Sequence, residues 1–168
     1  MPPTLKSKAV RNVSNIYGLW LSLAIIVLDQ ITKHWVHSNL AWYERVVVTP
    51  WLNLTHQRNT GAAFSSFSQL PPWFFVLLAV GVSLGMMIWL RRNAWGQRLV
   101  ALAFCCIIGG ALGNVIDRVR LGYVVDFVDF HIGNWHYAAF NVADIAISIG
   151  AALLILDMVR EWRRGSAE

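Results

Sequence analysis

Charged residues are scarce in this 168-residue chain: they make up 14% of it, against 57% for hydrophobic residues. Soluble domains usually hold about 25% charged and about 45–50% apolar residues. The mean hydropathy is +0.50, and the apolar residues are gathered in blocks. This pattern excludes an ordinary soluble core and indicates an integral membrane protein. No linker-like stretch or internal repeat is present, so we expect residues 1–168 to form one membrane domain.

Cysteine is also scarce. The two cysteines, Cys105 and Cys106, are adjacent inside an apolar run. Neighbouring residues of a helix do not readily reach disulfide geometry. We expect both to pack in the interior, and they say nothing about the redox compartment.

Motifs for metals, phosphates and nucleic acids are missing. The sequence has no glycine-rich phosphate loop, no zinc-ligand spacing and no Ser-His-Asp order. None of the five histidines lies deep in an apolar segment, where a haem-binding bundle would need it. The net charge of +5 comes from basic residues at the ends of apolar segments, where membrane orientation explains them. We therefore expect no metal, no cofactor and no nucleic-acid partner.

Four apolar segments have the length of a membrane span: about residues 17–36, 73–90, 99–116 and 140–159. Four spans place both termini on one side, and residues 37–72 and 117–139 on the other. The terminal side carries nine Lys and Arg residues and the other side five. Because short cytoplasmic segments are enriched in these residues, we expect both termini in the cytoplasm.

Two further patterns predict local structure. In residues 44–68, a run of valines at 46–48 and alternation at 52–55 predict one or two short strands that rest on the membrane. Within the third apolar segment, Gly109 and Gly113 share one helical face. Small residues at this spacing allow a neighbouring backbone to approach closely.

Asp126 and Asp144 lie on either side of a short polar connection, beside the fourth apolar segment. Two carboxylates that share one proton can hydrolyse an amide without a metal, because one activates water and the other protonates the carbonyl oxygen. The two must be close for repulsion to separate their pKa values. Sequence separation does not show that they meet, so two boundary carboxylates, one of them in a helix cap, remain the alternative.

Asn141 is a candidate N-cap of the fourth helix. In that case Asp144 is the third helical residue, where the helix dipole and free N–H groups favour a negative charge. We therefore predict that Asp144 is the ionised member of the pair and Asp126 the protonated one.

Other polar residues offer two roles each. Asp29 and Lys33 share a helical face, either as a structural ion pair or as support for a substrate or the carboxylates. Arg118, one turn after Asn114, can bind a lipid phosphate or a backbone carbonyl, or can extend to the membrane interface. Asn59 and Asn141 are either clamps for an extended peptide or plain turn and cap residues.

Five segments in order resemble bacterial lipoprotein signal peptidase, also called signal peptidase II, over about residues 17–160. They are residues 29–33 (DQITK), 59–64 (NTGAAF), 109–114 (GGALGN) with 117–118 (DR), 124–127 (VVDF) and 140–144 (FNVAD). The resemblance implies a mainly α integral membrane fold. It would have four transmembrane helices, a small extracytoplasmic β-sheet cradle at 44–68 and a second short extracytoplasmic segment at 121–139.

The resemblance also implies an aspartic endopeptidase of the bacterial cytoplasmic (inner) membrane, with its active site at the extracytoplasmic face. Its substrates would be prolipoproteins with a diacylglyceryl-modified cysteine, cut just before that cysteine. Membrane lipids would surround it, and globomycin-type inhibitors would block it. Catalysis maps onto Asp126 and Asp144. The supporting positions map onto Asp29, Lys33, Asn59, Gly61, Asn114, Arg118 and Asn141.

One position departs from the family pattern. Ile145 stands where a small hydroxyl residue often follows the second aspartate, which puts a local hydrogen bond in doubt. The competing class is a non-enzymatic four-span protein, a small transporter or assembly factor that uses Asp29 and the outer carboxylates as a proton or cation path. Transporters concentrate such groups near the membrane midplane. Here they gather at the outer boundary, which favours the peptidase.

Overall fold

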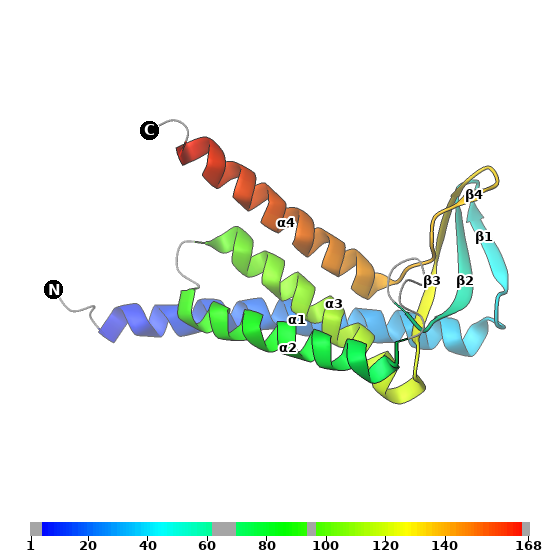
Figure 1. Ribbon diagram of the computed structural model, residues 1–168, viewed down its shortest axis with the longest axis horizontal. Helices are drawn as coiled ribbons and strands as arrows, with labels where there is room; N and C mark the ends of the chain where they lie inside the picture. Colours follow the sequence, from blue (N-terminus) through cyan, green and yellow to red (C-terminus); the bar gives the residue numbers. More distant parts are fainter. Residues whose placement is uncertain (1–4, 62–69, 94–96, 166–168) are drawn as a thin grey trace.

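The computed structural model describes residues 5–61, 70–93 and 97–165 of the chain. Within these residues the helices are α1 (Leu5–Asn39), α2 (Pro72–Asn93), α3 (Arg98–Leu121) and α4 (Val142–Gly165). The strands are β1 (Arg45–Thr49), β2 (Leu52–Asn59), β3 (Val124–Ile132) and β4 (Trp135–His136). The sheet lies at one end of an elongated helical bundle, opposite the start of α1 and the end of α4 (Figure 1). The predicted fold class, a mainly α membrane protein with a small β-sheet, is confirmed.

Among the described residues, three helices are long and apolar enough to cross a membrane, over Pro72–Arg92, Arg98–Leu121 and Val142–Gly165. The first predicted segment, 17–36, lies inside the longer α1, which carries Asp29 and Lys33 buried against the bundle. α3 continues to Leu121, beyond its predicted end at 116. The polar residues there do not end the helix, because Asn114, Asp117 and Arg118 are hydrogen-bonded to other parts of the protein. It ends instead at Gly122, whose φ of 81° is left-handed and whose N–H bonds the Arg118 carbonyl.

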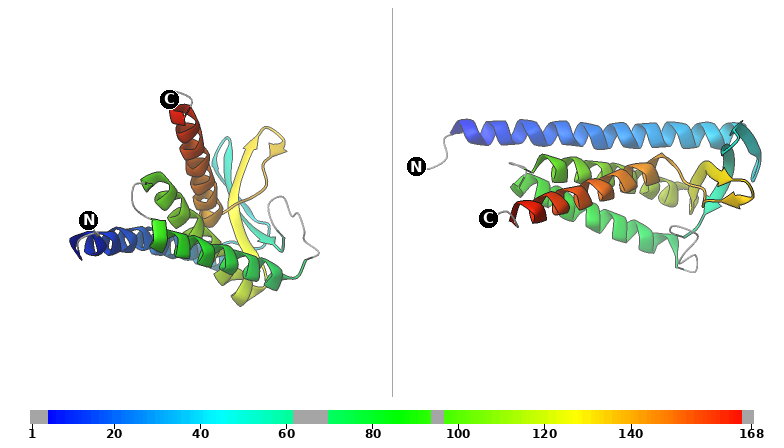
Figure 2. Two further views of the ribbon diagram at one scale, coloured as in Figure 1. Left: turned by 60° about the vertical axis from the view of Figure 1, so that its left-hand side comes forward. Right: turned by 90° about the horizontal axis from the view of Figure 1, so that it is seen from above.

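α3 is the central helix of the bundle and packs against α1, α2 and α4. α4 runs beside α3, with Gly110 and Gly150 at their contact, and diverges from α1 towards its C-terminal end (Figure 2). The close approach predicted from glycine spacing is confirmed, since a Cβ at Gly109 would lie 2.9 Å from the Ile25 Cβ of α1. Gly110, which the prediction did not single out, faces α4. A Cβ there would collide with the carbonyl oxygen of Ala143.

The sheet is antiparallel, in the order β1-β2-β3-β4. The strands predicted within 44–68 are confirmed as β1 and β2, while 62–69 lie outside the described residues. Residues 121–139 were expected only as an outer segment, but they supply β3 and β4. The missed signal is the run of β-branched and aromatic residues in VVDFVDFHI. In β2 and β3, Asn59 pairs with Val124 and Gln57 with Asp126, so Asn59 and Asp126 lie close together.

Candidate active site

Asn141 joins the two carboxylates that the sequence singled out. Its side-chain Nδ2 donates to Asp126 Oδ1 at 2.7 Å, and its backbone N–H donates to Asp144 Oδ2 at 3.2 Å. In return, the Asp144 N–H donates to Asn141 Oδ1 at 3.0 Å. This reciprocal pair of bonds is a capping box, so the predicted N-cap is confirmed. Strand β3 and the first turn of α4 thereby bring Asp126 and Asp144 to one place.

Asp126 lies on β3 and is 2% exposed. Burial and the charge of nearby Asp144 raise the pKa of Asp126 to about 7. Hydrogen bonds from Asn59 Nδ2, at 2.9 Å, and from Asn141 oppose this rise in pKa without cancelling it. Because a carboxyl group with that pKa is protonated below neutral pH, this direction is the one expected of a general acid.

Asp144 lies in the first turn of α4. Its Oδ1 accepts a hydrogen bond from Asn114 Nδ2 at 2.9 Å, and its Oδ2 accepts the backbone N–H of Asn141. Both oxygens therefore accept hydrogen bonds at the N-terminal end of a helix, where the helix dipole is positive.

The Lys33 ammonium is buried and bound by three side chains. It lies 2.9 Å from Asp29 Oδ2 and 3.0 Å from Asp117 Oδ2, and it donates to Asn114 Oδ1 at 2.8 Å. The predicted ion pair of Asp29 and Lys33 is confirmed. Since Asn114 also bonds Asp144, the ammonium is linked to the carboxylate pair through one amide.

Two residues of this cluster were missed as site candidates. Asp117 Oδ2 accepts the Val125 N–H at 3.1 Å and its Oδ1 accepts from Gln30 Nε2 at 3.0 Å, so it ties α1 and α3 to β3. The signal was present, because Asp117 follows Asn114 by three residues and therefore lies on the same helical face. Gln30 lies next to Asp29 in the DQITK segment.

Arg118 binds a backbone carbonyl, one of the three roles considered for it. Its Nη2 donates to the Gly61 carbonyl oxygen at 2.7 Å, and its guanidinium carbon lies 4.9 Å from the centre of the Phe75 ring. The Gly61 N–H in turn donates to Asn59 Oδ1 at 3.0 Å. Arg118 thus holds the turn that positions Asn59 against Asp126.

The nine residues predicted from sequence therefore belong to one connected cluster. Asn141 is fully buried, with its side chain bonded to Asp126 and Asn114. It acts as a helix cap and carboxylate partner in this structure, rather than as an exposed clamp. Asn59 also bonds Asp126, but it remains partly exposed at the edge of a cavity.

A cavity of about 470 Å³ opens beside this cluster. Its polar side is formed by Asn59, Asn114, Arg118 and Asp144. Another wall is formed by residues 137–140 and by the apolar face of α4, with Ile145 and Ile149. The Ile145 side chain offers no hydrogen bond, so the departure noted in the sequence makes this wall more apolar. A chain with both polar and hydrophobic groups fits such a cavity.

A family model described as "Signal peptidase (SPase) II" matches residues 21–160. The chain belongs to the signal peptidase II family. It is 50% identical over 146 residues to a lipoprotein signal peptidase of Hydrogenovibrio crunogenus, covering 85% of each chain. It is 46% identical over 142 residues to that of Yersinia enterocolitica, covering 83% of this chain and 84% of the relative.

Solved structures agree with this assignment. One is titled "Bacterial membrane enzyme structure by the in meso method at 2.3 A resolution", with a TM-score of 0.80, 29% identity and coverage of 86% of this chain and 88% of that one. A second, with the same title at 1.9 Å, has a TM-score of 0.75, 30% identity and coverage of 84% and 92%. This member of the signal peptidase II family is therefore an aspartic peptidase that cleaves signal peptides from prolipoproteins. It is a multi-pass bacterial membrane enzyme.

Proposed function

We propose that Asp126 and Asp144 are the catalytic dyad of this signal peptidase. The substrate is a prolipoprotein whose cysteine already carries diacylglycerol, and the enzyme cleaves the peptide bond just before that cysteine. The observation that carries the proposal is the position of Asn141, which bonds both carboxyl groups and so holds Asp126 next to Asp144, a residue that lines the cavity. Burial and the neighbouring charge raise the pKa of Asp126 to about 7, so that it holds a proton below neutral pH, as a shared-proton pair requires.

The reaction needs only water and the two carboxyl groups. Ionised Asp144 accepts a proton from a water molecule as the water oxygen attacks the carbonyl carbon, and Asp126 donates its proton to the carbonyl oxygen. When the tetrahedral intermediate collapses, Asp144 gives its proton to the amide nitrogen and Asp126 takes one back from a hydroxyl group. The peptide bond is broken, the cysteine leaves with a free amino group, and both carboxyl groups regain their starting states.

The supporting residues keep the dyad in this geometry. Asn59 and Asn141 hold Asp126, while Asn114 holds Asp144. Arg118 positions the turn at Gly61. Asp29 accepts the Ala143 N–H at 2.9 Å, so the buried charges around Lys33 also fix the start of α4.

The site is proposed to lie at the extracytoplasmic face of the inner membrane. The nine basic residues on the terminal side, against five on the other, support a cytoplasmic location of both termini. The sheet and the cavity lie at the opposite end of the bundle from the start of α1 and the end of α4 (Figure 1). The exposed Ile145 and Ile149 offer an apolar surface to the acyl chains of the substrate. Membrane lipids cover this surface when no substrate is bound.

Cleavage by the purified enzyme in detergent tests the substrate assignment. Matched prolipoproteins with and without the diacylglyceryl group are incubated with the enzyme and followed by mass spectrometry, with and without globomycin. We expect a mass shift that places the cut before the lipidated cysteine, inhibition by globomycin, and little cleavage of the unmodified protein. Equal cleavage of both proteins would contradict the lipid requirement.

Labelling tests the face of the membrane. Val47 on β1 is 75% exposed, so a Val47→Cys variant presents a thiol, whereas the native Cys105 and Cys106 are buried. A membrane-impermeant maleimide should label this variant in cells whose outer membrane has been opened, and should leave the parent enzyme unlabelled. Labelling only after the inner membrane is broken would place the sheet in the cytoplasm.

A further inference from the structure

A short segment, residues 137–140, forms one wall of the cavity and is called the strap below. It is tied to β3 at both ends. The Tyr137 N–H donates to the Phe130 carbonyl at 2.9 Å, and Phe140 exchanges hydrogen bonds with Val128 at 2.8 and 3.1 Å. Between these ties, the main-chain groups of Ala138 and Ala139 make no hydrogen bond to any residue that the structure describes. At Ala138 and Ala139 the strap therefore has peptide groups at the cavity wall that have no partner among the described residues.

The strand that leads into the strap is very short. β4 has two residues, and its pairs with β3 are His131 with His136 and Ile132 with Trp135. Two such pairs fix the position of a strand weakly, so side-chain contacts must define where the strap begins.

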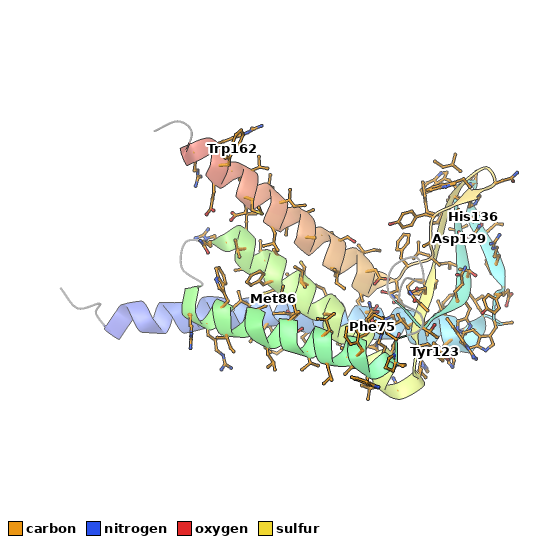
Figure 3. All side chains as sticks on the ribbon, viewed as in Figure 1. Phe75, Met86, Tyr123, Asp129, His136 and Trp162 are labelled. Carbon is orange, nitrogen blue, oxygen red and sulfur yellow. The ribbon has the colours of Figure 1, made fainter. Side chains whose placement is uncertain are left out.

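His136 supplies such a contact through Asp129 of β3. The His136 Nδ1 donates to Asp129 Oδ1 at 2.7 Å, and the two side chains lie together on the sheet, away from the helices (Figure 3). The His131 ring stacks on His136, with centroids 5.0 Å apart and an interplanar angle of 23°. The last residue of β4 is therefore bound through its ring face and through its ring nitrogen.

Asp129 is itself held rigidly. It is 2% exposed, accepts a hydrogen bond from Asn53 of β2 at 3.0 Å, and has Arg45 of β1 at 3.7 Å. Burial raises the pKa of Asp129, but these donors and His136 outweigh burial, so the pKa lies below its ordinary value. Asp129 thus joins all four strands and transmits the rigidity of the sheet to the strap.

We propose that the strap is the edge on which the extended peptide before the lipidated cysteine pairs through main-chain hydrogen bonds, and that His136 is a positioning residue that fixes this edge through Asp129. Adding a peptide strand to unpaired backbone groups is a general mode of recognition that tolerates varied side chains. The small side chains of Ala138 and Ala139 let a peptide backbone come close. This inference rests on the proposed function, because it assigns a binding role within the same cavity.

Kinetics of three variants test the positioning role. His136→Phe keeps an aromatic ring but loses the donor, whereas His136→Asn places a donor nitrogen on the same Cγ. We expect His136→Phe to raise KM for the diacylglyceryl prolipoprotein about fivefold, with kcat changed less than about twofold, and His136→Asn to recover most of the loss. His34→Phe, on the exposed face of α1, is the matched control and should change neither constant.

Substrates with modified backbones test the pairing itself, without depending on any variant. Diacylglyceryl lipopeptides are N-methylated at one residue at a time before the cysteine. At one or more positions, N-methylation should raise the KM of the wild-type enzyme about fivefold or more. Methylation at the same position should raise the KM of His136→Asn by a similar factor. In His136→Phe the rise in KM caused by N-methylation should be smaller, because the strap is no longer held in position to pair with the peptide.

Three results would overturn the inference: no N-methyl position that affects KM, a His136→Phe enzyme with wild-type KM, or a loss confined to kcat. The proposed function fails differently, through normal turnover when Asp126 or Asp144 is replaced. Cleavage at saturating substrate by His136→Phe with a raised KM would therefore support both.

Discussion

The side-chain amide of Asn141 donates a 2.7 Å hydrogen bond to Asp126, and the same residue caps the helix that carries Asp144. One asparagine therefore sets the relative position of a strand and a helix that come from different parts of the fold. The carboxyl pair depends on how α4 begins, and the start of α4 is also held by Asp29 through the Ala143 N–H.

The pH dependence of cleavage should report the protonation of Asp126. Its pKa is raised to about 7, so the general acid is present below that pH and is lost as pH rises through it. We expect kcat/KM to fall on the alkaline side with an apparent pKa of about 7, a value that belongs to the coupled pair. The measurement is initial cleavage rate against pH at low substrate concentration. A flat profile from about pH 6 to about pH 9 would contradict it.

Replacing Asn59 should shift the alkaline limb of this pH profile. Its amide donates to Asp126 and stabilises the ionised form, so Asn59→Ala should raise the apparent pKa and shift the limb to higher pH. Asn53→Ala is the matched control, because Asn53 lies on the same strand but donates to Asp129. The alkaline limb of Asn53→Ala should stay at the pH of the parent's limb, whatever happens to its KM. A limb that shifts to lower pH in Asn59→Ala would refute the stated role of its hydrogen bond.

Replacing Asp126 should separate activity from stability. Asp126→Asn removes the general acid, and we expect cleavage to fall by at least ~10²-fold. A raised pKa means that the folded state binds a proton more tightly, so the stability due to neutral Asp126 is lost as pH rises from about 4 towards about 7. Asp126→Asn should therefore unfold at a higher temperature than the parent near pH 8, with a smaller difference near pH 5. Thermal unfolding in detergent at both pH values makes the comparison, and a constant difference would argue against a raised pKa.

Much of the site was predictable because its residues carry local signals. Asn141 and Asp144 have the spacing of a helix cap, and Asp29 and Lys33 have that of an ion pair on one helical face. Such patterns depend only on residues close in sequence, so they can be recognised without knowledge of the fold. Three of the predicted spans lie in α2, α3 and α4, whose apolar stretches satisfy their own backbone hydrogen bonds, so they were predictable for the same reason.

The remaining features depend on contacts between distant segments. Asp126 lies in a run of β-branched and aromatic residues that favours a strand, but its position against Asn59 depends on pairing with β2, which no local signal gives. The role of Asp117 needs Lys33 from α1 and the Val125 N–H from β3 in the same place. The importance of Gly110 follows only from where α4 crosses α3. No spacing within one segment encodes these contacts.

Lys33 should be essential for folding. Its side chain is 3% exposed, and its ammonium group neutralises Asp29 and Asp117. Removing one member of a buried ionic cluster leaves uncompensated charge, so Lys33→Met should lower the free energy of unfolding by about 3–5 kcal/mol. A second change, Asp117→Asn, removes one of the stranded charges and should restore part of the loss in the Lys33→Met background.

The control for Lys33 is an exposed ion pair. Arg45 is 54% exposed at its side chain and lies 3.7 Å from Asp129, so Arg45→Ala should cost about 1 kcal/mol or less. Thermal and denaturant unfolding of the detergent-solubilised variants provide the comparison. Equal losses for Lys33→Met and Arg45→Ala, or no recovery in the double variant, would show that the cluster is not the buried charge centre described above.

A single methyl group added at Gly110 should disrupt the contact of α3 with α4 and lower both stability and kcat. A Cβ there collides with the Ala143 carbonyl and lies 2.8 Å from the Ile147 Cγ1, so Gly110→Ala must push the first turn of α4 away from α3. Overpacking of this kind costs about 1–3 kcal/mol, and because Ala143 precedes Asp144, we expect kcat to fall about tenfold or more.

The matched control is Gly81→Ala, since a Cβ at Gly81 in α2 has nothing within 4 Å and alanine favours a helix. This variant should keep full activity with equal or greater stability. If Gly110→Ala lost stability but kept its kcat, the dyad would not depend on this helix contact, and the link from α4 to catalysis through Asn141 would have to be abandoned.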